Sequence, residues 1–319
     1  MLATVLQRLL LALSRAEWAQ RAITRVPVTR RVARRFVAGE TLEAALEAIQ
    51  ALNRLGLRAT LDFLGESVRS REEACAAGDE YLRALEAIHR TGVQSGVSIK
   101  LTQFGLDIDE SFCADNVRRV VARAQQLGNF VCVDMESTAY TDRTLALIRA
   151  LRRDFSAVGA VLQAYLYRTE QDLLALAEAG IQIRLCKGAY AEPPSKAFPR
   201  KQDVDANYQR LIPLLLDHAA AAAPAQDGRV PPLAAFATHD ERMIESVKTY
   251  ARAQRIPRDR FEFQLLYGVR RDLQLRLAQE GYAVRVYVPY GTHWYPYFMR
   301  RLAERPANLW FFVRSLFAR

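Results

Sequence analysis

The residues best suited to chemistry stand near the C-terminal end of the chain. Arg300, Arg301 and Glu304 follow Tyr297 by three, four and seven positions. On a helix beginning near Trp294, such spacings place these side chains on one face. A face of this kind would pack poorly against a core, but two guanidinium groups suit a small anion such as a carboxylate. The alternative is an ordinary helix face exposed to solvent.

The segment before this helix has the pattern of a β-strand. Residues 284–288 alternate valine with Arg285 and Tyr287, which is the period of a strand with one buried face. We expect Tyr287 to point away from the valines, and Pro289 and Gly291 to end the strand.

Similar strand patterns recur along the chain, and helical patterns separate them. The strands are expected at residues 57–64, 97–101, 130–135, 158–166, 181–187, 233–238, 261–266 and 283–288. The helices are expected at about residues 71–91, 113–127, 140–153, 169–179, 203–222, 240–255 and 270–280. Eight strands alternating with helices predict an α/β fold, the (β/α)8 or TIM barrel. Residues 1–56, with helices at about 15–38 and 41–55, form an N-terminal helical arm and cap, and residues 57–319 form the barrel.

Alternation along these strands predicts which polar side chains face the inside of the barrel. The catalytic residues of such barrels gather where the strands end. The inward residues near these ends are Ser98, Lys100, Cys132, Asp134, Gln163, Arg184 and Tyr287. A buried lysine or arginine needs a partner or a ligand. The group is therefore either an active site or a structural network of ion pairs.

Two further strand ends carry polar residues. Lys187 and Gly188 follow the fifth strand, where a cation beside a residue without a side chain suits a phosphate group. Thr238 and His239 follow the sixth strand. No Gly-x-Gly-x-x-Gly motif follows a strand, so a Rossmann dinucleotide site is not predicted. No His-Glu-x-x-His motif or cluster of histidines and carboxylates predicts a metal site.

Composition narrows the class of protein. The chain has 319 residues, a net charge of +10 and a pI near 9.6, which favours an anionic partner. Nucleic acid is not predicted, because the basic residues are dispersed and no nucleic-acid-binding motif is present. The four cysteines lack metal or redox spacing and are expected to be reduced in a cytoplasmic protein. No apolar run is long enough to span a bilayer.

Seven segments together resemble the monofunctional bacterial proline dehydrogenases, in that family's order and over about residues 57–317. They are residues 97–105 (VSIKLTQFG), 133–136 (VDME), 184–190 (RLCKGAY), 236–240 (FATHD), 261–268 (FEFQLLYG), 287–291 (YVPYG) and 294–304 (WYPYFMRRLAE). The resemblance implies a distorted barrel whose last helix lies over the barrel mouth. It also implies oxidation of L-proline to 1-pyrroline-5-carboxylate by hydride transfer to N5 of a non-covalent FAD.

The resemblance further implies roles for individual residues. Asp134 and Arg184 would be catalytic, with Arg184 near flavin N5, and Glu66 would be a gate residue that pairs with Arg300. The substrate would contact Lys100, Leu185, Tyr190, Leu266, Tyr287, Arg300 and Arg301. The cofactor would contact Met135, Gln163, Arg184, Lys187, Gly188, Ala189, Thr238 and His239.

Two other functions are compatible with the residues alone. Lys100 or Lys187 could be the Schiff-base amine of a barrel lyase or aldolase. The basic chain could also be a membrane-surface scaffold. The leucine-rich residues 1–13 and the apolar residues 309–317 suggest either peripheral contact with the inner membrane face or an oligomer interface. The electron acceptor would be a quinone or another oxidant.

Overall fold

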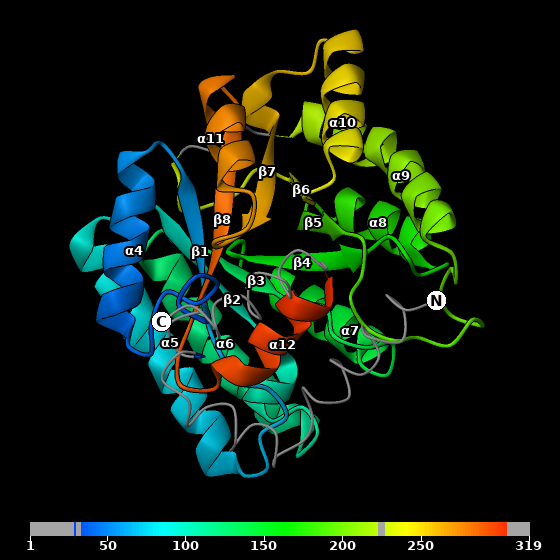
Figure 1. Cartoon of the computed structure of the whole chain (residues 1–319). Helices are drawn as coiled ribbons and strands as arrows, with labels where there is room; N and C mark the ends of the chain where they lie inside the picture. The colour runs from blue at the N-terminus through cyan, green and yellow to red at the C-terminus, as the bar shows by residue number, and fades with distance from the viewer. Residues whose placement is uncertain (1–28, 30–32, 223–226, 305–319) are drawn as a thin grey trace.

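A computed structural model describes Thr29, residues 33–222 and residues 227–304, without the side chains of Ala303 and Glu304. Eight parallel strands pair in chain order, and the last pairs with the first, so the sheet closes into a barrel (Figure 1). The predicted (β/α)8 barrel is therefore confirmed. The strands are β1 (Arg58–Phe63), β2 (Ser95–Ile99), β3 (Val131–Val133), β4 (Val158–Gln163), β5 (Gln182–Cys186), β6 (Ala234–Ala237), β7 (Phe261–Leu266) and β8 (Ala283–Tyr290).

Helices alternate with these strands and surround the barrel (Figure 1). Their observed bounds lie within three residues of the predicted ones. The helices are α4 (Leu42–Arg54), α5 (Arg71–Thr91), α6 (Glu110–Gln126), α7 (Thr141–Arg152), α8 (Thr169–Glu178), α9 (Lys201–Ala221), α10 (Glu241–Ala253), α11 (Arg271–Gln279) and α12 (Trp294–Glu304).

Local sequence explains where the helices begin and end. Thr41 caps α4 by accepting a hydrogen bond from the amide of Ala44, and Ser70 caps α5 in the same way through Glu73. At the other end of α5, Gly92 has a φ of 70°, a left-handed conformation that glycine adopts without a steric penalty.

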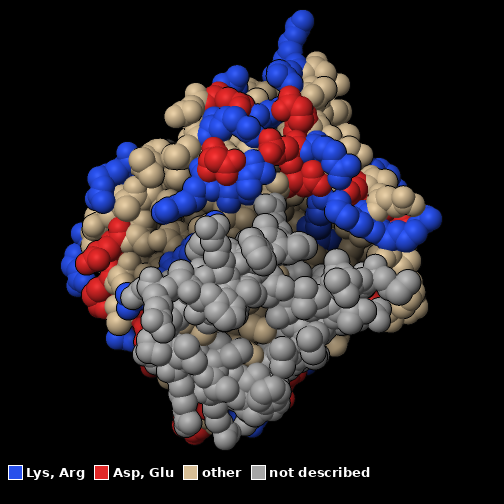
Figure 2. Space-filling view, viewed as in Figure 1, with Lys and Arg blue, Asp and Glu red and all other residues tan. Residues whose placement is uncertain are grey.

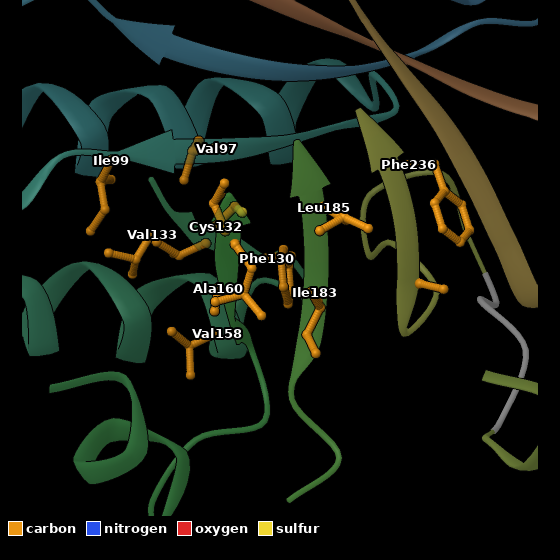
Figure 3. Close-up of a cluster of buried hydrophobic side chains, with 14 of the residues drawn as sticks. Val97, Ile99, Phe130, Cys132, Val133, Val158, Ala160, Ile183, Leu185 and Phe236 are labelled. Carbon is orange, nitrogen blue, oxygen red and sulfur yellow. The ribbon is translucent and has the colours of Figure 1, made fainter. Parts of the chain in front are cut away.

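The core lies between the strands and the surrounding helices. Figure 3 shows part of this layer, with Val97, Ile99, Val133 and Leu185 among the packed side chains. These four residues are fully buried, and each alternates along its strand with a polar residue on the opposite face. The outer face of the barrel is therefore apolar, and the polar residues are left to its interior.

Four predicted strand ends were wrong by two or three residues. β4 ends at Gln163, three residues before the predicted end at 166, because the chain turns into α8 there. β2 ends at Ile99, and Leu101 begins a short 3-10 helix, Leu101–Phe104. β3 ends at Val133, although the amide of Asp134 still bonds to the carbonyl of Ile99 at 2.8 Å. Both Lys100 and Asp134 thus follow their strands without losing the inward orientation.

The fourth correction concerns Pro289, which does not end β8. β8 runs on to Tyr290, although proline cannot donate a ladder hydrogen bond. This is tolerated because pairing with β7 stops at Tyr287, and only β1 accompanies β8 further. On the edge of β8 where pairing with β7 has ended, the carbonyl of Pro289 accepts a hydrogen bond from the amide of Ala38.

The last helix, α12, packs against the C-terminal ends of the strands. Its residues Trp294, Tyr295 and Phe298 form a small core with Leu64 after β1 and Val269 after β7. Figure 1 shows α12, in red, crossing in front of the strands. The expected position of this helix over the barrel mouth agrees with these contacts.

The terminal segments expected to be amphipathic, residues 1–13 and 309–317, lie outside the described residues, as does most of the helix expected at 15–38. Among the described helices, none has the length and apolar character needed to cross a membrane. Figure 2 shows basic side chains interspersed with acidic ones on the face formed by α9, α10 and α11. Ion pairs such as Arg270 with Glu241 and Lys201 with Asp205 lie there.

Candidate active site

The centre of the barrel mouth holds a buried lysine between two carboxylates. Lys100 Nζ lies 2.9 Å from Asp62 Oδ1 and 3.4 Å from Asp134 Oδ2. The two carboxylates raise the pKa of Lys100 against the opposing effect of burial. Lys100 is therefore held as an ammonium group, which suits anion binding and opposes the Schiff-base alternative, since a Schiff base needs a neutral amine.

Arg184, from β5, lies on the other side of Asp134. Its Nη1 donates to Asp134 Oδ1 at 2.7 Å and to the Ser98 hydroxyl at 3.1 Å, and its Nε donates to Gln264 Oε1 at 2.5 Å. Tyr287 completes the group, because its hydroxyl donates to Asp134 Oδ2 at 2.7 Å. Residues from β2, β5 and β8, or from the position just after β2, thus converge on the one carboxylate that follows β3.

The surrounding charges fix the ionisation of this carboxylate. Burial alone would raise the pKa of Asp134, but Lys100 and Arg184 outweigh it and hold the pKa below its ordinary value. Asp62 behaves differently, because burial and repulsion from Asp134 raise its pKa despite the nearby Lys100. Asp134 is therefore a fixed negative charge between two cations.

The arginines of α12 lie above this group. Arg300 Nη1 is 2.7 Å from Glu66 Oε1, in the loop after β1, so the pair expected from the sequence is present. Arg301 is 7% exposed and lies over the ring of Tyr297, with its guanidinium carbon 4.9 Å from the ring centre.

Tyr190, which follows β5, is a further residue predicted to contact the substrate. Burial raises the pKa of Tyr190, and the carboxylates of Glu136 and Glu66 add to this effect.

Lys187 is not available as an isolated cation for phosphate. Its Nζ lies 2.5 Å from Asp205 and 2.7 Å from Asp240. The next residue, Gly188, has a φ of 110°, and a Cβ there would come within 2.3 Å of the ring of Tyr165. Glycine is thus required at this position by the ring of Tyr165 as well as by the backbone.

The remaining predicted cofactor residues lie at or just after the ends of β3 to β6. His239 Nε2 accepts a hydrogen bond from the amide of Leu266, and Thr238 is buried beside it in sequence. Gln163 donates from Nε2 to the carbonyls of Met135 and Glu136, whereas its Oε1 is buried without a hydrogen-bond partner. An acceptor left in this state is a place where a ligand can donate a hydrogen bond.

One predicted substrate contact lies apart from this group. Leu185 is fully buried in the main core, and β-strand alternation puts it on the face of β5 opposite Arg184. Conversely, Asp62 was not predicted, although the alternation that placed Lys100 inward would have found it. Asp205 and Asp240 carried no such signal, because they lie at the starts of helices that only the fold brings to Lys187.

This fold and site define a class of protein. A closed parallel barrel with a lysine, a carboxylate and arginines gathered at its C-terminal mouth is a (β/α)8-barrel enzyme arranged to bind a small anionic substrate. Comparison with known proteins narrows the class. A family model described as proline dehydrogenase matches residues 45–314.

Named relatives agree with the family model. The chain is 45% identical over 290 residues to proline dehydrogenase of Deinococcus radiodurans, covering 89% of this chain and 90% of that protein. It is 42% identical over 288 residues to proline dehydrogenase 1 of Bacillus subtilis, covering 90% of this chain and 91% of that protein. The chain therefore belongs to the proline dehydrogenase family.

Solved structures show the same barrel. The structure of proline utilization A from Bdellovibrio bacteriovorus inactivated by N-propargylglycine matches 86% of this chain with a TM-score of 0.78 at 25% identity. A structure of proline utilization A with proline bound in remote sites matches 88% with a TM-score of 0.70. The chain spans about a third of the length of these larger proteins, 33% and 31%.

Proposed function

We propose that this flavoenzyme oxidises L-proline to 1-pyrroline-5-carboxylate, the first step of proline catabolism. The observation that carries the proposal is the charged group at the barrel mouth, in which Asp134 joins Lys100 to Arg184 beneath the Arg300–Glu66 pair. Such a site offers cations to the carboxylate of proline and a fixed anion near its amine.

The chain's own residues would bind and orient the substrate. Lys100, Arg300 and Arg301 would hold the carboxylate, since a guanidinium fork fixes a carboxylate in one orientation. Asp134 would hold Lys100 and Arg184 in place through its two oxygens. The ring of proline would lie among the side chains of Tyr190, Leu266 and Tyr287.

The residues present fit a flavin, which we propose to be non-covalent FAD. The buried and unpartnered Oε1 of Gln163 can accept a hydrogen bond from a flavin ring, and Arg184, on the neighbouring strand β5, supplies a cation inside the same barrel. Gly188, Ala189, Thr238 and His239 would hold the remainder of the cofactor, and Met135 would contact it. Lys187 would lie beside it with its charge shared with Asp205 and Asp240. When bound, FAD would accept a hydride at N5 from the proline ring carbon next to nitrogen.

The visible absorbance of a bound flavin, and its loss when proline reduces the flavin, test the proposal directly. The purified protein should be yellow, and its visible absorbance should bleach when L-proline is added without oxygen. Sodium borohydride in the presence of a keto acid tests the Schiff-base lyase in parallel. A colourless protein that borohydride couples covalently to the keto acid would replace this function with the lyase.

The electron acceptor and its location extend the proposal. We propose a quinone at the inner membrane face, since the net charge of +10 favours an anionic surface. The protein should float with anionic liposomes at low salt and sediment freely at high salt. If it does not float at low salt, the apolar terminal segments are better assigned to a subunit interface, which analytical ultracentrifugation would then show.

A further inference from the structure

A buried chain of hydrogen bonds runs inside the barrel from the start of β8 to Arg184. Arg285 Nε donates to Glu262 Oε1 at 2.6 Å, and Gln264 Nε2 donates to the same oxygen at 2.6 Å. Gln264 Oε1 in turn accepts from Arg184 Nε at 2.5 Å. These four side chains are no more than 7% exposed, and only Arg184 among them belongs to the proposed binding and catalytic residues.

The order of donors and acceptors along this series of hydrogen bonds is fixed. A carboxylate can only accept, so the Gln264 amide must turn its NH2 group toward Glu262 and its oxygen toward Arg184. A flipped amide would place an oxygen against the Glu262 carboxylate and a donor against the Arg184 donor. Glu262 thereby selects one of the two orientations of Gln264.

Arg285 and Glu262, with which this chain of hydrogen bonds begins, are held in place independently of the barrel mouth. Arg285 also donates to the carbonyls of Ala59 and Gly228, and its Nη2 lies 3.1 Å from Glu262 Oε2. The Glu262 carboxylate is therefore clamped by a bidentate arginine that is itself tied to the backbone. A bidentate pair of this kind is a rigid anchor for the next link, Gln264.

Gln264 accepts a hydrogen bond from Arg184 Nε, at the opposite edge of the guanidinium group from Nη1, while the ring of Tyr287 lies under the plane, 5.4 Å from the guanidinium carbon. Arg184 Nη1 is committed to Asp134 and Ser98, and the bond from Nε to Gln264 supplies the second direction that fixes the plane. Without an acceptor at Nε, only the two bonds of Nη1 and the ring of Tyr287 hold the guanidinium group, so its plane is less well fixed. The buried Nε would also lose its partner, at a cost of about 1–3 kcal/mol.

We propose that Gln264, oriented by Glu262, is a positioning residue that sets the plane of Arg184 and hence its ion pair with Asp134. The inference rests on the proposed proline oxidation for its kinetic consequences, but not for its structural ones. Gln264 has no proposed contact with the substrate or the flavin, and it acts through Arg184.

Two substitutions separate this role from simple packing. Gln264→Met keeps the length and volume of the side chain but removes both hydrogen bonds. Gln264→Glu keeps an acceptor for Arg184 but places a second carboxyl group against Glu262, so it must carry a proton. Asn116→Ala is the control, because it removes a buried amide that joins α6 to the carbonyl of Ala74 in α5, outside the barrel interior.

For each variant, the melting temperature, the affinity of the flavin-free protein for FAD, and the pH profile of proline oxidation should be measured. Gln264→Met should lower kcat about tenfold with little change in KM, as expected for one lost hydrogen bond to a charged group. It should also weaken FAD binding, and move the acid limb of the profile to higher pH as Arg184 stabilises the Asp134 carboxylate less well. Gln264→Glu should recover kcat at low pH and lose it as pH rises and the added carboxyl ionises.

The outcomes are distinguishable from those of the proposed function. If Gln264→Met matches the parent in kcat, pH profile and FAD affinity, and only melts earlier as Asn116→Ala does, Gln264 has a structural role alone. If the parent protein itself does not oxidise proline, the proposed function fails. The effect of Gln264→Met on FAD affinity, compared with Asn116→Ala, then still decides whether Gln264 positions Arg184.

Discussion

Arg300 Nη1 and Glu66 Oε1 lie 2.7 Å apart, so an ion pair joins the last helix to the loop after the first strand. The two side chains are 21% and 29% exposed, and neither is sealed in the core. A partly exposed pair of this kind can be opened at modest cost, because water compensates the separated charges. We therefore propose that the carboxylate of a substrate replaces that of Glu66, and that α12 is a lid that closes on its ligand.

Glu66→Ala tests the lid. Proline affinity should change little, because Glu66 does not contact the substrate in the closed state. The rate of anaerobic flavin reduction should fall about tenfold, since closure of α12 is less well guided. Stopped-flow absorbance measures both quantities, and Glu66→Gln should lie between the parent and Glu66→Ala. A large rise in KM with an unchanged reduction rate would assign Glu66 to substrate binding instead.

Arg301→Met tests the carboxylate clamp. Loss of a desolvated arginine that grips the substrate carboxylate should raise KM for proline by roughly a hundredfold. Arg276→Met on α11 is a matched control, because Arg276 pairs with Glu241 on the outer surface and should leave KM unchanged. Equal KM values for the two variants would mean that Arg301 only packs on Tyr297.

Ligand analogues test the same clamp without mutation. Tetrahydrofuroic acid keeps the ring and the carboxylate and should compete with proline. Pyrrolidine keeps the ring and the amine but lacks the carboxylate, so it should hardly bind. Inhibition constants from steady-state kinetics give the comparison. Efficient reduction of the flavin by pyrrolidine would show that the arginines of α12 are not a carboxylate site.

Asp240→Ser tests the pH dependence of stability. Burial would raise the pKa of Asp240, but hydrogen bonds from Lys187 and Arg242 hold it well below its ordinary value of 3.8. The ionised group therefore stabilises the fold at neutral pH, and this contribution is lost as pH falls below 3.8. Asp240→Ser keeps an oxygen to cap α10 and removes the charge, so the unfolding free energy should fall less steeply with acid.

Urea unfolding at several pH values below neutrality measures this slope. Asp115→Ser, at an exposed position on α6, is the control and should keep the slope of the parent. Asp240→Ala should cost about 1 kcal/mol more than Asp240→Ser, because it also removes the helix cap. An unchanged slope in Asp240→Ser would show that the pair with Lys187 does not stabilise the fold.

Mild acid should release the flavin intact. Covalent attachment through cysteine requires a thiolate, and burial raises the pKa of Cys186, at the end of β5, to about 12. His239 already accepts a hydrogen bond through Nε2. Mass spectrometry of the supernatant after acid precipitation should therefore identify free FAD. Yellow colour that remains with the precipitated polypeptide would contradict this prediction.

The sequence by itself determined the architecture and the inner face of most strands. Valine, isoleucine and leucine at period two marked the outer faces of the strands, and this fixed the inward orientation of Lys100, Asp134, Arg184 and Tyr287. The reason is local, since strand geometry turns successive side chains to opposite faces. Strand ends were less well predicted, because they depend on pairing between strands. Pro289, for example, is tolerated within β8 only because pairing with β7 ends at Tyr287.

Apart from the Arg300–Glu66 pair, which the family resemblance implied, only the tertiary structure decided which charges meet. Lys187 and Asp240 are far apart in sequence, yet closure of the barrel and the start of α10 bring them to 2.7 Å. In the same way, Gln264 reaches Arg184 across the barrel interior from a strand two places away. Pairing of this kind depends on where whole elements pack, and a pattern within one strand or helix carries no information about it.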